Sequence, residues 1–347
     1  MRSTLRNLKA TVLWHNTDMG STAALLKEAA IPVSEDDCRA CADPCDQGHE
    51  EYSSRFDVDM ETQMLGSVKP YTRQVIVSTG KTDWAHDVSS VSGSLAHFLD
   101  ATSSPHASNL PSHLHAPSNR SVPGVHSTAS GTKTTILNGS HHTLSGDPKK
   151  DTVLILPDYK VVGEVERSTE GARTFWQDVF EPKTEKETVT HVLPYACVIL
   201  LCSHKKRDNR CAIAAPKLEH GLSVALEREE WEVHTQLSEH DLEAPSPPPS
   251  ANGAAEDAYL AQLKAAAQSK RALILKVSHI GGHKFAGNVI IYTPTGTSIW
   301  YGRVTPHNVD AIVRDTILGG KVIPELLRGG LNLARPEESS RKTLNDW

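Results

Sequence analysis

The chain has 347 residues, of which 38% are hydrophobic and 22% charged, and its formal net charge at pH 7 is -6. This mildly acidic balance argues against a general nucleic-acid binder, which needs a basic surface for the phosphates. No 18 consecutive apolar residues occur, so we expect no membrane-spanning helix. Six cysteines without a recognisable secretory signal indicate a reducing compartment, in which thiols serve as metal ligands or stay free.

The first part of the chain combines short helix and strand patterns with a polar segment. A strand is predicted at 73–78, a second strand at 151–156 and a helix at 174–180. Between the strands, residues 101–150 contain no aromatic residue except histidine and only one acid, and are rich in Ser, Thr and Pro. Such a composition predicts a disordered insert, in which only residues 134–137 are suited to pair as a short strand. We therefore expect an N-terminal α/β region over 1–189 that carries this insert.

The second part has a denser alternation of apolar patterns. The elements predicted in chain order are strand 195–201, helix 212–230, helix 254–269, strands 272–277, 288–293 and 298–304, and helix 308–318. Strand, helix, strand, a β-hairpin and a closing helix together indicate an α/β sandwich over 190–333. A proline-rich insert interrupts it at about 238–254, and a flexible polar tail follows at 334–347.

Two pairs of metal-ligating side chains follow two of the predicted buried strands. Cys202 and Cys211 flank one polar loop, and His279 and His283 flank a second loop with two glycines between them. Glycines permit positive φ angles and a close approach of the backbone to a bound group. Two thiolates and two imidazoles suit either a tetrahedral zinc ion or a 2Fe-2S cluster, and the spacing leaves both open.

The loop between the two cysteines carries four cations and one acid. This net positive charge predicts lowered thiol pKa values and a surface on which an acidic redox partner docks. Within the loop, His204 is expected to support the ligands, whereas His307 is expected to have a structural role.

A second group of potential ligands lies near the N-terminus. Cys38, Cys41, Cys45 and His49 have the spacing C-x2-C-x3-C-x3-H, which is compatible with zinc or with a second cluster. The alternative is a flexible, thiol-rich segment among acidic residues.

Several strings together carry a family resemblance. They are CRACADPCDQGHEEY (38–52), LGSVKPY (65–71), STGKTDW (78–84), CSHKKRDNRC (202–211), SHIGGHKFAGNVIIY (278–292) and WYGRVTPHN (300–308). In these strings the chain resembles the fungal sucrase/ferredoxin-like family, in particular its actin-patches-distal protein branch. The resemblance covers most of the chain outside the two inserts and the tail.

The resemblance implies a thioredoxin-like C-terminal domain with a 2Fe-2S cluster, held by Cys202 and Cys211 on one iron and by His279 and His283 on the other. It implies an electron carrier in cytosolic redox or oxidative-stress homeostasis, and we find no paired carboxylates typical of a sucrase or another hydrolase. Because imidazole donates less negative charge than thiolate, the expected potential lies above that of all-cysteine clusters. Titration of the imidazoles would make this potential fall as the pH rises.

The tail and the first residues bear on partners and location. Trp347, preceded by Asp346, resembles the C-terminal anchor of clients of the cytosolic iron-sulfur targeting machinery, although Asn345 occupies the position of an aliphatic residue. We therefore expect that machinery and an unidentified redox partner as partners, and neither nucleic acid nor membrane. The predicted location is the cytoplasm. The alternative is the mitochondrion, because a mitochondrial branch of the family shares the C-terminal motif and the first seventeen residues are weakly basic.

Two other classes of protein remain open at this point. One is a structural zinc-binding interaction module with the same two cysteine and two histidine ligands. The other is a thiol-disulfide enzyme using Cys202 and Cys211, but eight intervening residues depart from the C-x-x-C spacing of thioredoxin-type redox motifs.

Overall fold

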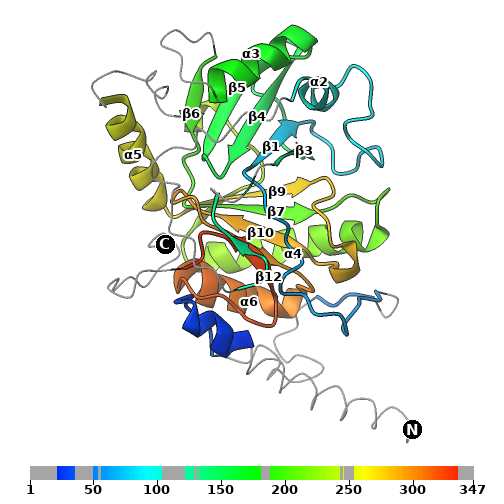
Figure 1. Ribbon diagram of the computed structural model, residues 1–347, viewed down its shortest axis with the longest axis vertical. Coiled ribbons are helices and arrows are strands. Elements are labelled where there is room, and N and C mark those ends of the chain that lie inside the picture. The colour runs from blue at the N-terminus through cyan, green and yellow to red at the C-terminus, as the bar shows by residue number, and fades with distance from the viewer. Residues whose placement is uncertain are drawn as a thin grey trace, which may run out of the picture.

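The computed structural model describes residues 22–35, 50–53, 56–103, 122–128, 131, 133–180, 188–242, 245 and 254–334. Within these residues, twelve strands form one mixed sheet with helices packed against it (Figure 1), which confirms the α/β class. No helix of the described part is long and apolar enough to cross a membrane. The order of the strands along the sheet is β2-β12-β11-β10-β7-β9-β3-β1-β4-β5-β6, and β8 pairs with β9 beside this path.

The first group of strands forms the upper part of Figure 1. In chain order its elements are β1 (Arg73–Ser78), α2 (Leu95–Thr102), β3 (Thr134–Gly139), β4 (Lys150–Leu156), β5 (Lys160–Glu166), α3 (Thr169–Phe180) and β6 (Thr190–Val192). The strand β1 lies between β3, to which it is parallel, and β4, to which it is antiparallel. Helices α2 and α3 cover one face of this group through Leu99, Phe175 and Trp176.

The expected disorder of residues 101–150 is wrong for 122–128 and 133–150. The strand β3 lies inside this segment and pairs along its whole length with β1, and His141 after it is fully buried. The short strand expected at 134–137 is part of β3, but the composition of the segment did not predict the order around it. Backbone pairing with a strand about 60 residues away stabilises β3, and composition does not report such pairing. Residues 104–121 lie outside the described part.

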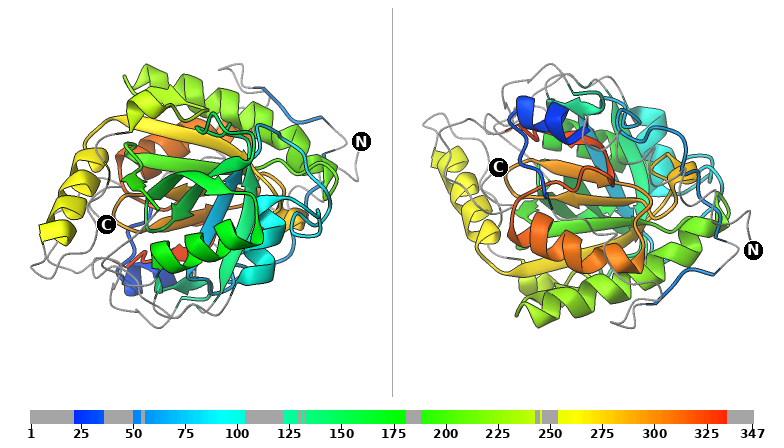
Figure 2. Two further views of the ribbon diagram at one scale, coloured as in Figure 1. Left: turned by 90° about the horizontal axis from the view of Figure 1, so that it is seen from above. Right: turned by 90° about the horizontal axis from the view of Figure 1, so that it is seen from below.

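The second group of strands lies below the first in Figure 1. Its elements are β7 (Cys197–Cys202), α4 (Asn209–Arg228), β8 (Glu232–His234), α5 (Ala254–Ala267), β9 (Arg271–Val277), β10 (Val289–Tyr292), β11 (Ser298–Tyr301), α6 (Val309–Ala311), its π-helical continuation (Ile312–Leu318) and β12 (Leu327–Leu331). Short 3-10 helices cover Glu239–Asp241, His283–Phe285 and Pro306–Asn308. Figure 2 shows α4 along one side of the strands and α5 beyond their edge.

The pairing of this group matches the predicted strand, helix, strand and hairpin. The strands β7 and β9 are parallel neighbours, and β10 and β11 form an antiparallel hairpin on the other side of β7. The thioredoxin-like assignment itself stays a prediction. Part of the predicted proline-rich insert is also ordered, since Asp241 forms an ion pair with Arg271 at 2.6 Å.

Segments from before residue 190 also pack against the second group. Leu26 lies in the hydrophobic core that α4 and α6 share, and Val33 forms a β-bridge with Val322. The short strand β2 (Val125–His126) pairs with β12. The predicted boundary at 189/190 therefore does not separate these segments from the second group.

The two groups of strands meet at their carboxyl ends. One register pair, Gly139 with Val277, joins β3 to β9 in antiparallel orientation. The backbone N–H of Ser278 donates to the Asn138 carbonyl at 2.8 Å, and that of Ser140 donates to Lys276 at 2.9 Å. Because β1 is parallel to β3 and β7 is parallel to β9, the loops after all four strands gather at this junction.

A buried ion pair joins β1 to the turn after β4. The Arg73 guanidinium donates twice to the Asp158 carboxylate, at 2.7 and 2.9 Å, and both side chains are no more than 5% exposed. Replacing Asp158 by Ala is expected to lower the free energy of unfolding by about 3–5 kcal/mol, because it leaves a buried charge without its partner.

Urea unfolding of the two proteins side by side measures this loss. The matched control is Glu164→Gln, which removes an exposed ion pair with Lys150 at 2.9 Å and is expected to cost less than about 1 kcal/mol. Equal losses in the two variants would contradict the importance of burial.

Candidate functional site

The four predicted ligands come from the ends of two adjacent strands. Cys202 is the last residue of β7, and His279 lies two residues beyond the end of β9. Because these strands are parallel and Cys202 pairs in register with Val277, both side chains emerge at the junction. His283 begins the 3-10 helix that follows. Cys211 lies in the first turn of α4, since this helix begins three residues before the predicted start and not after the loop.

The two cysteines form a buried pair. Their exposed fractions are 2% and 1%, and a hydrogen bond from the Cys211 thiol lowers the pKa of Cys202 well below its ordinary value. The neighbouring His279 ring and the backbone of Ile280 lower the Cys202 pKa further. The same bond to Cys202, together with burial, raises the pKa of Cys211. The two thiols therefore titrate as a pair, with the pKa lowered at Cys202 and raised at Cys211.

The predicted cause of this lowering, the basic loop, is largely wrong. Arg210 pairs with Asp208 at 2.7 Å, and Asp208 also accepts from the backbone N–H of Arg210 and so caps α4. Lys205 and Lys206 are exposed to solvent, where water screens their charge. The hydrogen bond between the cysteines is the main cause instead.

The loop that carries the histidines has the predicted positive φ angles. They are +84° at Gly281 and +71° at Gly282. The rings of His279 and His283 lie with centroids 5.5 Å apart and their planes at 41°. Nδ1 of His279 is buried, and no described group makes a hydrogen bond with it. Buried polar atoms usually have a hydrogen-bond partner, so a buried ring nitrogen without one is a candidate metal ligand.

His204 supports this loop, as predicted. Its Nδ1 accepts from the backbone N–H of His279 at 3.3 Å and therefore carries no proton. The proton of the neutral ring is on Nε2, which donates to the Trp84 carbonyl at 3.0 Å. Burial lowers the pKa of His204, which favours this neutral form. The Trp84 ring packs edge-on against the imidazole at 5.8 Å. The loop after β1 is thus connected to a ligand of the second group.

Arg328 is a residue of the candidate site that the sequence did not indicate. It lies on β12 and is 2% exposed, and burial lowers its pKa to about 10. Its Nη1 donates to the Gly281 carbonyl at 3.1 Å and to Oδ1 of Asn288 at 2.6 Å, and its Nε donates to Oγ of Ser67 at 3.0 Å. No described carboxylate forms an ion pair with it. Arg328 is therefore a buried positive charge directly behind the histidine loop.

Close packing requires glycine at position 282. A Cβ atom built there would lie 2.3 Å from Nη2 of Arg328, which is far inside van der Waals contact. The Gly282 carbonyl accepts from the Asn288 amide at 3.1 Å, and the backbone of Asn288 accepts from the N–H of Cys202 at 3.2 Å. Asn288 thus connects β7, the histidine loop and Arg328.

The four predicted ligands are arranged as two pairs, the cysteines in contact and the histidines side by side. A tetrahedral zinc ion requires its ligand atoms around one point. In the described part of the chain, no three His, Cys, Asp or Glu side chains are arranged to hold one metal ion. A 2Fe-2S cluster instead takes two ligands on each iron, and here the cysteines form one contacting pair and the histidines another.

Two other predictions concern residues away from this site. The potential second site of Cys38, Cys41, Cys45 and His49 lies outside the described residues. His307 lies in the 3-10 helix Pro306–Asn308, 3.9 Å from the carboxylate of Glu51.

Comparison with known proteins places this site in a family. The family model described as sucrase/ferredoxin-like matches residues 64–329, which is more than half of the chain and includes all four predicted ligands and Arg328. The chain belongs to the sucrase/ferredoxin-like family. No solved structure matches it.

Three curated relatives of this sucrase/ferredoxin-like chain are fungal proteins. Actin patches distal protein 1 of Saccharomyces cerevisiae is 27% identical over 301 residues, which cover 80% of this chain and 78% of that protein. Altered inheritance of mitochondria protein 32 of Debaryomyces hansenii is 27% identical over 287 residues, 78% of this chain and 87% of that protein. The protein of the same name from Clavispora lusitaniae is 33% identical, but the match spans only 38% of this chain and 34% of that protein.

Proposed function

We propose that this protein transfers electrons through a 2Fe-2S cluster held by Cys202, Cys211, His279 and His283. The observation that carries the proposal is the pairing of the donors: two buried cysteines in contact and two histidines side by side, at the ends of adjacent parallel strands. Such strand ends hold side chains rigidly, as an electron-transfer site needs.

When bound, the cluster would accept and donate single electrons. The protein's own residues would set its potential and protect it. Two neutral imidazoles in place of two thiolates support a potential in the range of about -150 to +300 mV known for mixed histidine and cysteine ligation. Cys202 and Cys211 are buried, so water does not reach their sulfur atoms. Arg328 adds a positive charge that favours the reduced, more negative state of the cluster.

The decisive experiment is the metal content and the spectrum of the purified full chain. We expect a brown protein with about two irons and two sulfides per chain, and an electron paramagnetic resonance signal after reduction by dithionite. A colourless protein with one zinc per chain would instead establish the zinc-binding interaction module. A colourless protein with neither metal would contradict both metal sites and would leave the hypothesis of a thiol-disulfide enzyme that uses Cys202 and Cys211.

The cysteine loop is also the proposed docking surface for an acidic redox partner. Lys205, Lys206 and Arg207 lie exposed on it, next to the buried Cys202. Complementary charge at this place would accelerate association and shorten the distance to the cluster. The cytoplasmic location and the role of Trp347 as an anchor for the iron-sulfur targeting machinery stay predictions, and Trp347 lies outside the described residues.

A further inference from the structure

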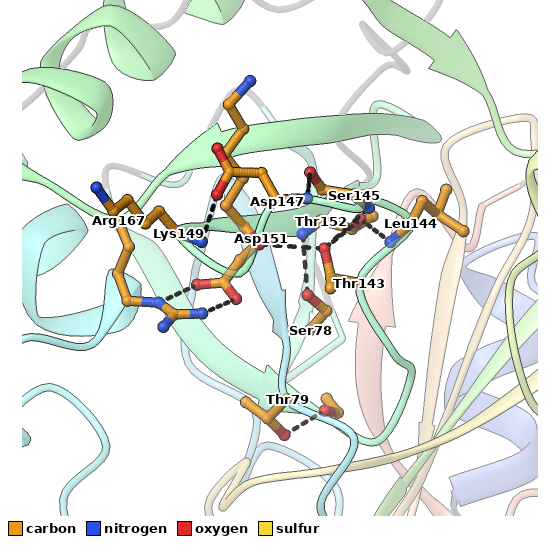
Figure 3. A network of polar contacts seen from close by, with 12 residues as sticks. Ser78, Thr79, Thr143, Leu144, Ser145, Asp147, Lys149, Asp151, Thr152 and Arg167 are labelled. Atoms are coloured by element: carbon orange, nitrogen blue, oxygen red, sulfur yellow. Dashed lines mark hydrogen bonds and ion pairs between the residues drawn. The ribbon is translucent and has the colours of Figure 1, made fainter.

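A cavity of about 680 Å³ opens at the junction of the two groups of strands, and we call it the junction cavity. It lies at the carboxyl end of β1, beside the N-terminal end of α2, and the cysteine loop contributes Lys206 to its wall. Figure 3 shows the polar network on one side of it, where Asp151, Arg167, Ser78 and Thr79 lie. Ligands of α/β proteins bind at the carboxyl ends of parallel strands and between domains.

The charges around the junction cavity favour an anion. Asp151 is held by two hydrogen bonds from Arg167, at 2.9 and 2.6 Å, so this pair is neutral. The Asp83 carboxylate accepts from the backbone N–H of Lys206 at 3.0 Å. The ammonium groups of Lys81 and Lys206 form no ion pair with any described carboxylate. The remaining charge is therefore positive.

The first turn of α2 adds to this preference. Ser94, Leu95 and Ala96 line the junction cavity, and Ser94 caps the helix by accepting from the N–H of His97 at 3.1 Å. The first N–H groups of a helix have no partners within the helix, and the helix dipole is positive there. Lys81, Lys206 and a helix start thus line one space.

Part of the wall is apolar, which gives room for more than a bare inorganic ion. Val77, Val91, Leu95 and the ring of Trp84 line it, and Val91 is 42% exposed. A volume of about 680 Å³ lies in the range of sites that hold organic molecules. The lining therefore suits a molecule with one anionic group and an apolar or planar body.

We propose that the junction cavity binds a small organic anion, with its phosphate or carboxylate group between Lys81 and Lys206. The binding proposal does not rest on the cluster, because none of the four ligands lines the junction cavity. The cavity is nevertheless next to them: the carbonyl of Trp84 accepts from His204, which in turn accepts from the N–H of His279. A ligand that contacts Trp84 would therefore lie two hydrogen bonds from a proposed iron ligand.

Isothermal titration calorimetry of the purified full chain tests the proposal with three probes. ADP carries phosphates on a planar body, citrate carries only carboxylates, and adenosine has the planar body without charge. We expect ADP or citrate to bind at micromolar to millimolar concentration and adenosine to bind at least about tenfold more weakly. The stronger of the two anions identifies the anionic group.

Two lysine variants and one control locate the site. Lys81→Gln and Lys206→Gln are each expected to weaken anion binding by about tenfold, the effect of losing one charge-assisted hydrogen bond. Lys149→Gln removes a lysine that does not line the junction cavity and is expected to leave binding unchanged. Absence of binding by both anions, or equal weakening by all three variants, would overturn the proposal. Both results are independent of the iron content, so they do not bear on the proposed cluster.

Discussion

Replacing Cys202 by Ala is expected to reduce the iron content of the purified protein from about two atoms per chain to less than about 0.2. Cys202 is the member of the buried cysteine pair whose pKa is lowered, and it lies at the end of a strand that is buried along its whole length. Without Cys202, Cys211 loses the thiol with which it forms a hydrogen bond. Iron and sulfide analysis with the visible spectrum measures the loss.

The same strand supplies a matched control. Cys197 lies five residues before Cys202 on β7, is fully buried, and has a pKa raised to about 12 by burial, as expected of a thiol that only packs. Cys197→Ala removes the same atom from the same strand and is expected to keep the iron. Circular dichroism checks that both variants fold. If Cys202→Ala kept its iron, or if both folded variants lost it equally, the assignment of Cys202 would be wrong.

Replacing Arg328 by Met is expected to weaken iron retention about 10- to 100-fold, the usual effect of removing a group that orients a metal ligand. The guanidinium donates hydrogen bonds to two acceptors, the carbonyl of Gly281, which lies between the two histidines in the sequence, and Oδ1 of Asn288. The substitution leaves both acceptors without this donor and removes a buried positive charge. Iron loss to a chelator over time measures retention, and a redox titration is expected to give a lower potential.

The variant Arg328→Lys separates geometry from charge. Lysine keeps the charge but cannot reproduce the planar pair of donors, so we expect weakened iron retention with the potential nearly unchanged. Arg303→Met is the control, because Arg303 also lies over the Phe285 ring but donates to the carbonyls of Asp59 and Thr62, away from the histidine loop. Equal iron loss from Arg303→Met and Arg328→Met would show a general loss of packing around Phe285.

Much of the fold was predictable because its central strands have strong local patterns. The apolar runs before Cys202 and before His279 predicted β7 and β9 to within about two residues. The strand β3 was predicted only as a short pairing segment at 134–137 inside an otherwise disordered insert, and β12 was not predicted. The first lies in a segment poor in large apolar residues, and the second contains two glycines, so both depend on pairing with distant strands rather than on local preference.

The candidate site was likewise predictable only in part. The sequence by itself determined which side chains are available as ligands, that they follow buried strands, and that two glycines lie between the histidines. Only the tertiary structure decided that the cysteines contact each other, that His204 connects Trp84 to His279, and that Arg328 lies behind the glycine loop. The physical reason is separation along the chain: local patterns reflect the geometry of single elements, whereas Ser67 and Arg328 are 261 residues apart and meet only through the pairing of the sheet.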